Sequence, residues 1–386
     1  MNAFPYLFPL LTCLLIYLSK GDSVDVKSYV LTVLALWWLT RLIYLLFKKY
    51  RESATEYLGA YVTVAIHEDA WVERRVETRR VQVGTDKSGR AIYHNVQNVR
   101  HVSHPDQWYA RTNIGSNINI SRRTYNGIRM LWGTREHHSS ITGNHIVGGV
   151  RHCQQYQFAD VTAMFDFQTD EPSPFDYPDY AERFVTVTTS HRYTNKIRRS
   201  HSIFKFEKVS KEEKEAYGLY DYPEVVDNNQ ECILGREFPP SVHRAFSLFN
   251  AYYGAKHQIR VFILLFDADK DITVSEKQRA YWSGGNKNEL VVCLGVDDSD
   301  TVRWCHAFSW MDEPIMTVKT EGYFREHEQL DLLSFNQWLR ANLSHWQRKA
   351  FKDFDYIHVP LSPVQYWTWF LLCLLANVVA VLINVK

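Results

Sequence analysis

Residues 29–51 form an apolar run about as long as a bilayer is thick, and this run constrains the chain more than any other feature. A helix needs about 20 apolar residues to cross the hydrocarbon core of a membrane. A second run of that length, residues 364–385, lies at the other end of the chain. We therefore expect the polar chain between the two runs to fold beside a membrane and to be anchored at both ends.

A shorter apolar stretch, residues 3–19, precedes both runs. A secretory signal peptide requires a basic segment before such a stretch and a small-residue cleavage site after it, and the sequence has neither. We predict a short first membrane helix, which forms a hairpin with a second helix at residues 29–47, so that residues 1–51 make one transmembrane hairpin. An interfacial or re-entrant segment is the alternative for residues 3–19.

Two polar side chains lie inside the long runs. Arg41 lies within the second helix, where a charge is costly unless it reaches the interface or finds a partner. We interpret Arg41 as a side chain that extends toward the interface, and an ion or proton relay is the alternative. In the last helix, Asn377 is expected to form a hydrogen bond between helices.

The distribution of basic residues predicts the orientation of the chain. Basic side chains follow the second helix and precede the last one, whereas both termini carry few charges. The side chains concerned are Lys48, Lys49, Arg51, Arg348, Lys349 and Lys352. Because loops rich in Lys and Arg stay in the cytoplasm, residues 48–363 are expected to be cytoplasmic.

Composition narrows the class of protein further. The formal net charge is +1, so no global field attracts nucleic acid, and no specific nucleic-acid partner is indicated. Aromatic residues make up 15% of the chain, which is typical of β-rich cores and membrane interfaces. The six cysteines include no CxxC motif, so neither a disulfide framework nor a paired-cysteine zinc site is expected.

Residues 52–225 are expected to form a β-rich soluble region. Charged and apolar residues alternate over residues 74–83 and 91–101, and a turn separates the two stretches, as in a β-hairpin. The arginines and histidines of this hairpin could form a basic face that binds anionic lipid or nucleic acid. The alternative is a solvated surface, whose arginines pair with the nearby acidic residues Glu68, Asp69, Glu73 and Glu77.

Several histidines and one cysteine follow within a short stretch. They are His137, His138, His145, His152 and Cys153. Their spacing matches neither two histidines on one helix face nor a zinc knuckle, so hydrogen-bonding loop histidines are expected rather than a zinc site.

Residues 226–360 are expected to form a three-layer α/β region. Apolar periodicity predicts helices and strands in the order helix–strand–helix–strand–strand–helix, at residues 240–255, 258–266, 273–282, 289–296, 301–309 and 334–354. The first strand is apolar enough to be buried on both faces. Thr273 and Glu276 match the capping-box pattern at the start of the second helix. The predicted fold class is therefore α+β, with a β-rich part and an α/β part tethered by three transmembrane helices.

The buried strand, the YWSGG turn and the LVVCLGVDD hairpin of this region resemble the TPM-type domain of membrane-anchored envelope and thylakoid proteins. The resemblance covers residues 230–355. It implies a domain outside the cytoplasm, opposite to the orientation that the basic residues predict. The activities in that family are diverse and include metal binding and phosphatase-like reactions, so the resemblance implies no single activity.

Three aspartates, Asp267, Asp269 and Asp271, follow the buried strand at the edge where open α/β sheets bind ligands. Carboxylates are ligands for hard cations, and these three residues are the predicted metal site, for Ca²⁺ or Mg²⁺. Ile272 and Gln278 stand where an EF-hand loop has Gly and Glu, and Asp271 stands where a DxDxT phosphatase has Thr. A solvated acidic turn is the alternative.

Two further stretches are weaker candidates for a binding or catalytic site. The turn at residues 284–288 could bind a phosphate through backbone N–H groups and Lys287, but a strand follows it rather than a helix. Cys305 and His306 could form a nucleophile pair, but neighbouring residues of a strand point to opposite faces.

The leading functional hypothesis is a membrane-anchored, non-enzymatic binding or scaffold protein. Its expected partners are the lipid bilayer and a possible protein partner. A membrane-tethered hydrolase that depends on a divalent metal at Asp267, Asp269 and Asp271 is one alternative. A component of a transport or channel assembly is another.

Overall fold

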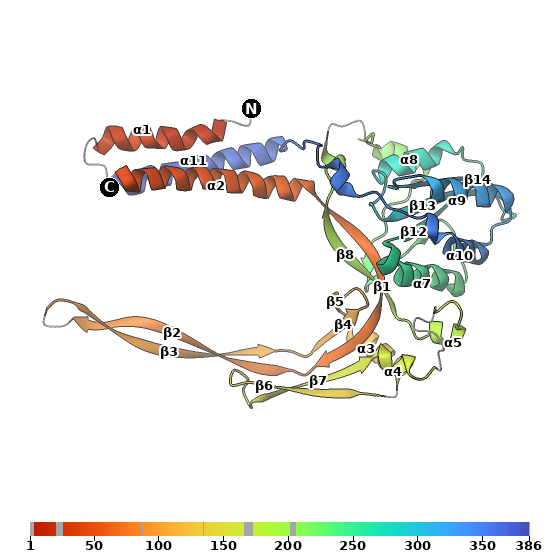
Figure 1. The fold of residues 1–386 in the computed structure, drawn as a ribbon, viewed down its shortest axis with the longest axis horizontal. Coiled ribbons are helices and arrows are strands. Elements are labelled where there is room, and N and C mark those ends of the chain that lie inside the picture. Colours follow the sequence, from red (N-terminus) through yellow and green to blue (C-terminus); the bar gives the residue numbers. More distant parts are fainter. Residues whose placement is uncertain are drawn as a thin grey trace.

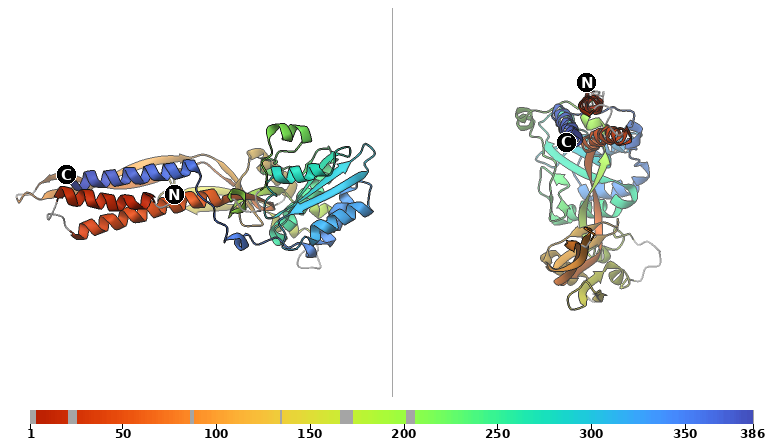
Figure 2. Two further views of the ribbon diagram at one scale, coloured as in Figure 1. Left: turned by 90° about the horizontal axis from the view of Figure 1, so that it is seen from above. Right: turned by 90° about the vertical axis from the view of Figure 1, so that its left-hand side faces the viewer.

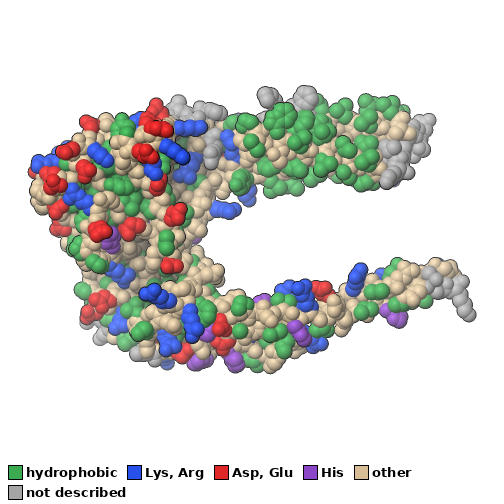
Figure 3. All heavy atoms as spheres, turned by 180° about the vertical axis from the view of Figure 1, so that it is seen from behind, with side chains coloured by type: hydrophobic (Ala, Val, Ile, Leu, Met, Phe, Trp, Pro, Cys, Tyr) green, Lys and Arg blue, Asp and Glu red, His purple; other side chains and the backbone are tan. Residues whose placement is uncertain are grey.

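The computed structural model describes residues 4–20, 26–85, 88–133, 135–165, 173–200 and 206–385. Three helices form one arm, a long β-hairpin forms a second arm, and a mixed helix-and-sheet body joins the two (Figure 1). The two arms leave the body on the same side, so the outline resembles a letter C (Figures 1 and 3).

The first arm contains α1 (Phe8–Lys20), preceded by a 3₁₀ turn at Phe4–Leu7, together with α2 (Val26–Glu52) and α11 (Pro363–Val385). Figure 2 shows the three helices side by side. Two of them, over Val30–Glu52 and Pro363–Ile383, are long and apolar enough to cross a membrane. The prediction of three spanning helices is therefore corrected to two, because the 13 residues of α1 rise only about 20 Å against a hydrocarbon core of about 30 Å.

The surface of this arm is apolar (Figure 3). Leu31 and Trp38 of α2 and Val364 of α11 are each more than 60% exposed, which is unusual for a surface in contact with water. Inside the arm, Trp369 is fully buried and its Nε1 donates a hydrogen bond of 3.0 Å to the carbonyl oxygen of Thr40. The guanidinium carbon of Arg41 lies 5.5 Å from the centre of the Tyr44 ring.

The β-rich half is built on β1 (Ser53–Glu68), which follows α2 directly. The sheet is antiparallel in the order β5-β4-β1-β7-β6, and β8 pairs with the first part of β1. The strands are β4 (Gln107–Thr112), β5 (Asn117–Asn119), β6 (His137–Thr142), β7 (Val150–Gln157) and β8 (Thr186–Thr194). Helix α3 (Arg122–Trp132) covers the sheet with Tyr125, Ile128 and Trp132 buried.

The second arm is the predicted hairpin, which is confirmed and is longer than expected. It consists of β2 (Trp71–Thr85) and β3 (Ala91–His104), which pair with each other from Trp71↔His104 to Thr85↔Ala91. Its base joins the body through the bridge Glu73↔Ile146 and through backbone hydrogen bonds from Arg74 to His145 and from Val147 to Val72. We call β2 and β3 together the ribbon.

The α/β half contains a four-stranded sheet in the order β11-β12-β13-β14. Its strands are β11 (Ile233–Leu234), β12 (Arg260–Asp267), β13 (Glu289–Val296) and β14 (Val302–Ser309); the first three are parallel and β14 is antiparallel. Helices α7 (Pro240–His257) and α10 (Leu332–Ala341) lie on one face and α8 (Thr273–Tyr281) on the other (Figure 1). Every residue of β12 before Asp267 is buried, as predicted. The α+β class is thus confirmed.

Three local predictions in this half need correction. The expected helix 334–354 ends at Ala341 and continues as 3₁₀ turns at Leu343–His345 and Phe351–Phe354. Helix α9 (Ile315–Glu326), which packs against β14, was not predicted. Thr273 is the first helical residue rather than the N-cap, because Asp271 Oδ1 already accepts a hydrogen bond of 2.8 Å from its backbone N–H.

Short elements complete the described chain. They are α4 (Phe158–Thr162), α5 (Pro178–Ala181), a 3₁₀ turn at Ile197–Arg199, α6 (Lys211–Tyr217), β9 (Val225–Val226) and β10 (Asn229–Gln230).

The two halves meet where β1 crosses α7. A Cβ atom on Gly59 would lie 2.3 Å from the carbonyl oxygen of Asn250, and one on Gly254 would lie 2.7 Å from the carbonyl oxygen of Gly59. Both positions therefore need glycine, because the strand and the helix touch backbone to backbone. The Asn288 side chain adds a hydrogen bond of 2.8 Å to the carbonyl oxygen of Tyr57.

Candidate functional site

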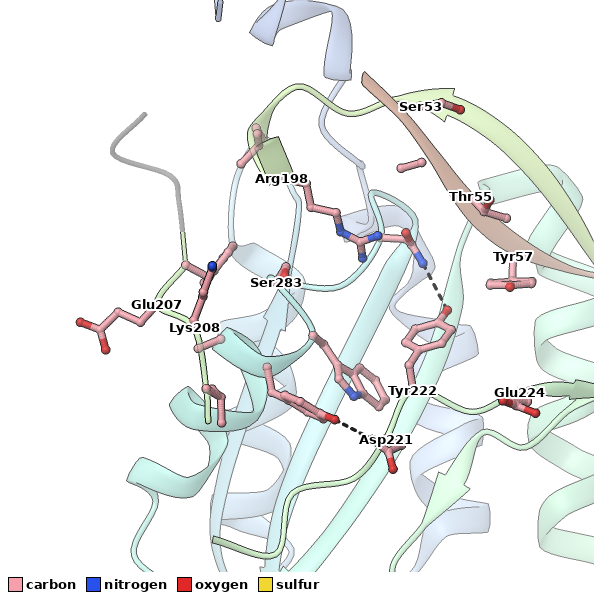
Figure 4. Close-up of a pocket in the computed structure, with 18 residues that line it drawn as sticks. Ser53, Thr55, Tyr57, Arg198, Glu207, Lys208, Asp221, Tyr222, Glu224 and Ser283 are labelled. Carbon is pink, nitrogen blue, oxygen red and sulfur yellow. Dashed lines mark hydrogen bonds between the residues drawn. The ribbon is translucent and has the colours of Figure 1, made fainter. Parts of the chain in front are cut away.

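One pocket of the body lies at the junction between the membrane arm and the two halves (Figure 4). It has a volume of about 1010 Å³. Its walls come from the start of β1, the 3₁₀ turn that follows β8, two connecting segments and the end of α8. Its lining residues include Tyr57, Arg198, Asp221, Tyr222, Tyr281 and Asn286.

A buried carboxylate lies beneath this pocket. Glu289 is 1% exposed, and its two oxygens accept hydrogen bonds of 2.7 Å from the backbone N–H and from the side-chain amide of Asn286. The Tyr222 hydroxyl donates a further hydrogen bond to Glu289. Burial, together with the neighbouring carboxylate, raises the pKa of Tyr222 well above its usual value, so this phenol remains a neutral donor.

This network engages the glycine turn at residues 284–288. The Asn286 N–H binds Glu289, and Lys287 Nζ lies 3.3 Å from a carboxylate oxygen of Glu56 and 4.7 Å from the centre of the Tyr193 ring. Glu289 and Glu56 thus already bind the Asn286 N–H and Lys287, the groups that were candidates for phosphate binding.

One carboxylate of the pocket wall is held by two partners. Asp221 pairs with Lys214 Nζ at 2.6 Å and accepts a hydrogen bond of 2.6 Å from the Tyr281 hydroxyl. These two contacts, that of Lys214 first, lower the pKa of Asp221. Among the residues that the structure describes, no His and no Cys lines the pocket.

A second pocket, of about 890 Å³, lies between the end of α2 and the start of α11. Lys49, Arg51 and Arg192 line it, together with Ser362 and Gln365. The charged groups of this lining are all cationic. Because both helices leave the body here, this end of the membrane arm presents positive charge where lipid headgroups would lie.

The predicted aspartates stand at the end of β12 but do not form a compact ligand set. Asp267 ends the strand, and Asp271 is engaged with the start of α8. Within the described ranges, one group of His, Cys, Asp or Glu residues has three potential ligand atoms within 4.8 Å of one another, and it is His67, Asp69 and Asp106. A Ca²⁺ or Mg²⁺ site at Asp267, Asp269 and Asp271 stays a prediction.

The histidines singled out in the sequence lie mostly in strands rather than in loops. His137, in β6, pairs with Asp160 at 2.6 Å, and His152, in β7, lies 3.2 Å from the Ser140 hydroxyl. Cys153 is buried, which raises the pKa of its thiol. These histidines serve as hydrogen-bond partners, as expected.

Cys305 and His306 do not form a nucleophile pair. His306 lies between Glu276 and Glu321, at 3.0 Å and 3.1 Å. Burial raises the pKa of the Cys305 thiol well above its usual value, which disfavours the reactive thiolate.

The sequence did not predict the group formed by His67, Asp69 and Asp106. His67 and Asp69 are close in the chain, but the whole ribbon separates them from Asp106. No spacing rule connects them, so only the pairing of β1 with β4 brings them together.

Comparison of the chain with protein-family models, with curated proteins and with solved structures found no match. The resemblance of residues 230–355 to a TPM-type domain therefore stays a prediction.

Proposed function

We propose that this chain is a membrane-anchored, non-enzymatic binding protein and that the ribbon is its binding element. Its ligand is the anionic surface of the bilayer that holds α2 and α11. One observation carries the proposal: a strongly basic ribbon, exposed on both faces, extends on the same side of the body as the apolar arm (Figures 1 and 3).

The charge of the ribbon supports an anionic ligand. Its residues include two glutamates, Glu73 and Glu77, and five arginines, Arg74, Arg75, Arg79, Arg80 and Arg100, and Arg90 lies in the turn between the strands. The alternative, arginines paired with acidic neighbours, holds for Arg75, which pairs with Glu73. Glu73 also pairs with His104, and Glu68 pairs with Arg151 of β7 rather than with an arginine of the ribbon. Anionic lipid attracts basic side chains by about 1 kcal/mol each.

The ribbon is long enough to reach the depth of the bilayer that the membrane arm would cross. The 15 residues of β2 span about 50 Å, and the 27 residues of α2 span about 40 Å. A polar ribbon with two open edges cannot enter hydrocarbon, because its unpaired backbone groups would lose their water. The ribbon must therefore bend at its base and lie along the headgroups.

The edges of the ribbon favour lipid over a partner protein that adds a strand. Arginines stand on both faces, and a bulge interrupts the pairing between Gln82 and Gly84. Both features are typical of edges that resist strand addition. An isolated two-stranded hairpin is only marginally stable in water, so contact with a surface also stabilises the ribbon itself.

The proposal includes the orientation that the basic residues predict, with residues 48–363 in the cytoplasm, where the bilayer surface is anionic. A metal-dependent hydrolase has less support, because Asp267, Asp269 and Asp271 are not gathered into a ligand set. A transport component has less support, because the described chain offers two spanning helices.

Amide hydrogen exchange of the full chain in nanodiscs tests the proposal. The β2 and β3 amides should exchange quickly in phosphatidylcholine and several-fold more slowly when phosphatidylserine is included. A triple variant with Arg79→Gln, Arg80→Gln and Arg100→Gln should lose this protection. A control with Arg123→Gln, Arg129→Gln and Arg135→Gln, which has the same net charge, should keep it.

Equal exchange in the two bilayers would overturn the proposal. Protection that depends on an added protein rather than on lipid charge would also overturn it, in favour of a protein partner.

A further inference from the structure

The corner from which the ribbon leaves the body holds a histidine between two carboxylates. His67 and Asp69 stand at the end of β1, and Asp106 directly precedes β4. His67 Nδ1 lies 3.6 Å from Asp69 Oδ1, and His67 Nε2 lies 3.8 Å from Asp106 Oδ1. One ligand atom from each of the three residues falls within 4.8 Å of the others.

Two neighbours hold the His67 ring in one orientation. The Trp108 ring stacks on it with the ring centres 5.0 Å apart and an angle of 1° between the planes. Gln154 Oε1 lies 3.3 Å from His67 Nδ1. Because an amide oxygen can only accept, this contact assigns the proton to Nδ1 and leaves Nε2 with a lone pair.

The other ring nitrogen has an unusual environment. His67 Nε2 is shielded from solvent and has no hydrogen-bond partner among the described residues. Its lone pair faces the Asp106 carboxylate, so an acceptor faces an acceptor. A buried acceptor without a donor costs about 1–3 kcal/mol, and a cation between the two groups would remove this cost.

We propose that His67 Nε2, Asp69 and Asp106 bind a divalent first-row transition metal ion such as Zn²⁺. Imidazole and carboxylate are both common zinc ligands, and two carboxylates balance the charge of the ion. Ligating histidines almost always donate their other N–H to an oxygen, as the contact with Gln154 provides. Two bonds of about 2.1 Å at a tetrahedral angle place ligand atoms about 3.4 Å apart, so the 3.8 Å gap between His67 Nε2 and Asp106 Oδ1 needs only a small closure. The Asp69 carboxylate, whose Oδ1 lies nearer to Nδ1, would have to turn toward the Nε2 side of the ring.

The position of the ion gives it a mechanical role. Asp69 lies two residues before the first residue of the ribbon and Asp106 two residues after the last, and the Ala70 N–H already donates a hydrogen bond of 2.7 Å to Asp106 Oδ1. A metal ion across these residues would fix the angle at which the ribbon leaves the sheet. This role rests on the proposed function of the ribbon, whereas the metal site itself does not.

Isothermal titration of the full chain in a neutral detergent with ZnCl₂ tests the site without anionic lipid. Wild type should bind one ion that His67→Ala and Asp106→Asn no longer bind. Gln154→Ala should weaken binding by about 10–100-fold, the usual effect of removing a residue that orients a ligand. His137→Ala removes a second His–Asp pair, with Asp160, for which the described residues supply no third ligand, and should leave the site intact.

Absence of a stoichiometric Zn²⁺ site in wild type would overturn the proposal. Zn²⁺ binding that His67→Ala leaves unchanged would also overturn it. Asp106→Asn preserves the acceptor for Ala70, so equal thermal unfolding of this variant and wild type without metal shows that loss of binding is not loss of folding. A failure of the ribbon to bind phosphatidylserine would leave this titration unaffected, which separates the two proposals.

Discussion

The Thr12 hydroxyl donates a hydrogen bond of 2.6 Å to Asn377 Oδ1, and this contact joins the first helix of the chain to the last. Asn377 Nδ2 in turn donates to the carbonyl oxygen of Cys373 at 2.7 Å, so both ends of the amide are satisfied. Asn377 was predicted to form a bond between helices, and that prediction is confirmed. The contact explains how α1, too short to span a bilayer by itself, is held against α11.

Replacing the asparagine tests this contact. Asn377→Leu should lower the free energy of unfolding by about 0.6–2 kcal/mol, the range for hydrogen bonds between membrane helices. Thermal unfolding in detergent measures the change. Thr368→Val is the matched control, because Thr368 is exposed and bonds only within its own helix, to the carbonyl oxygen of Val364. Equal losses in both variants would contradict a specific role for Asn377.

The crossing of β1 and α7 predicts that two glycines cannot be replaced. Gly59→Ala and Gly254→Ala should each destabilise the protein by about 1–3 kcal/mol, because a methyl group would force the backbones apart. Gly322, in α9, has open space around its Cα, so Gly322→Ala should stabilise by about 0.5–1 kcal/mol through helix propensity. Thermal unfolding that ranks the three variants otherwise would argue against this packing.

The stability of the protein should depend strongly on the Tyr222 hydroxyl, which donates to the buried carboxylate of Glu289 beneath the junction pocket. Tyr222→Phe removes a donor from buried Glu289 and should cost about 1.5–3 kcal/mol, the range for hydrogen bonds to charged groups. Tyr281→Phe removes a hydrogen bond to the exposed Asp221 and should cost less than about 1 kcal/mol. Chemical unfolding followed by tryptophan fluorescence compares the two, and similar costs would show that Glu289 does not depend on Tyr222.

The N-cap of α10 predicts a pH dependence. Asp331 accepts hydrogen bonds from the Ser334 side chain and from two backbone N–H groups, and these contacts lower its pKa. Because the pKa is lower in the folded state, the carboxylate stabilises the fold fully at pH values above its unfolded-state pKa of about 3.9. This contribution is lost as the pH falls through the folded-state pKa.

Asp331→Ala should therefore cost about 0.5–2 kcal/mol at neutral pH. Asp331→Asn, which can still cap the helix, should cost less, and its difference from wild type should shrink as the pH falls below about 4. Unfolding curves at pH values on both sides of this point measure the effect. A difference that grows with acidity would have the wrong sign for this cap.

The orientation proposed for the chain predicts a labelling pattern. A cysteine introduced at Ser88, near the tip of the ribbon, should be protected from an impermeant maleimide in intact cells, whereas one at Lys386 should be labelled. Permeabilised cells provide the control, because both cysteines should then react. Labelling of Ser88→Cys in intact cells would reverse the orientation and favour the location that the TPM resemblance implies.

Features that depend on short-range interactions were predicted from the sequence, and features that depend on long-range contacts were not. The spans at Val30–Glu52 and Pro363–Ile383, the ribbon and β12 depend on patterns within one segment, and the sequence predicted each of them. The capping box at Thr273 was wrong, because Asp271, two residues earlier, took the capping role. Helix α9 was missed, because two of the residues on its buried face, Thr317 and Thr320, are polar and weaken the apolar period.

The sequence by itself determined the two long apolar helices, the hairpin and a mixed helix-and-sheet body, because apolar periodicity and charge act over a few residues, but it also predicted a third spanning helix that the structure does not bear out. Only the tertiary structure decided which distant groups meet. Thr12 reaches Asn377, Gly59 meets Gly254, and Asp106 returns to His67 after the whole ribbon. Such contacts depend on how strands pair and helices cross, and no local pattern encodes them.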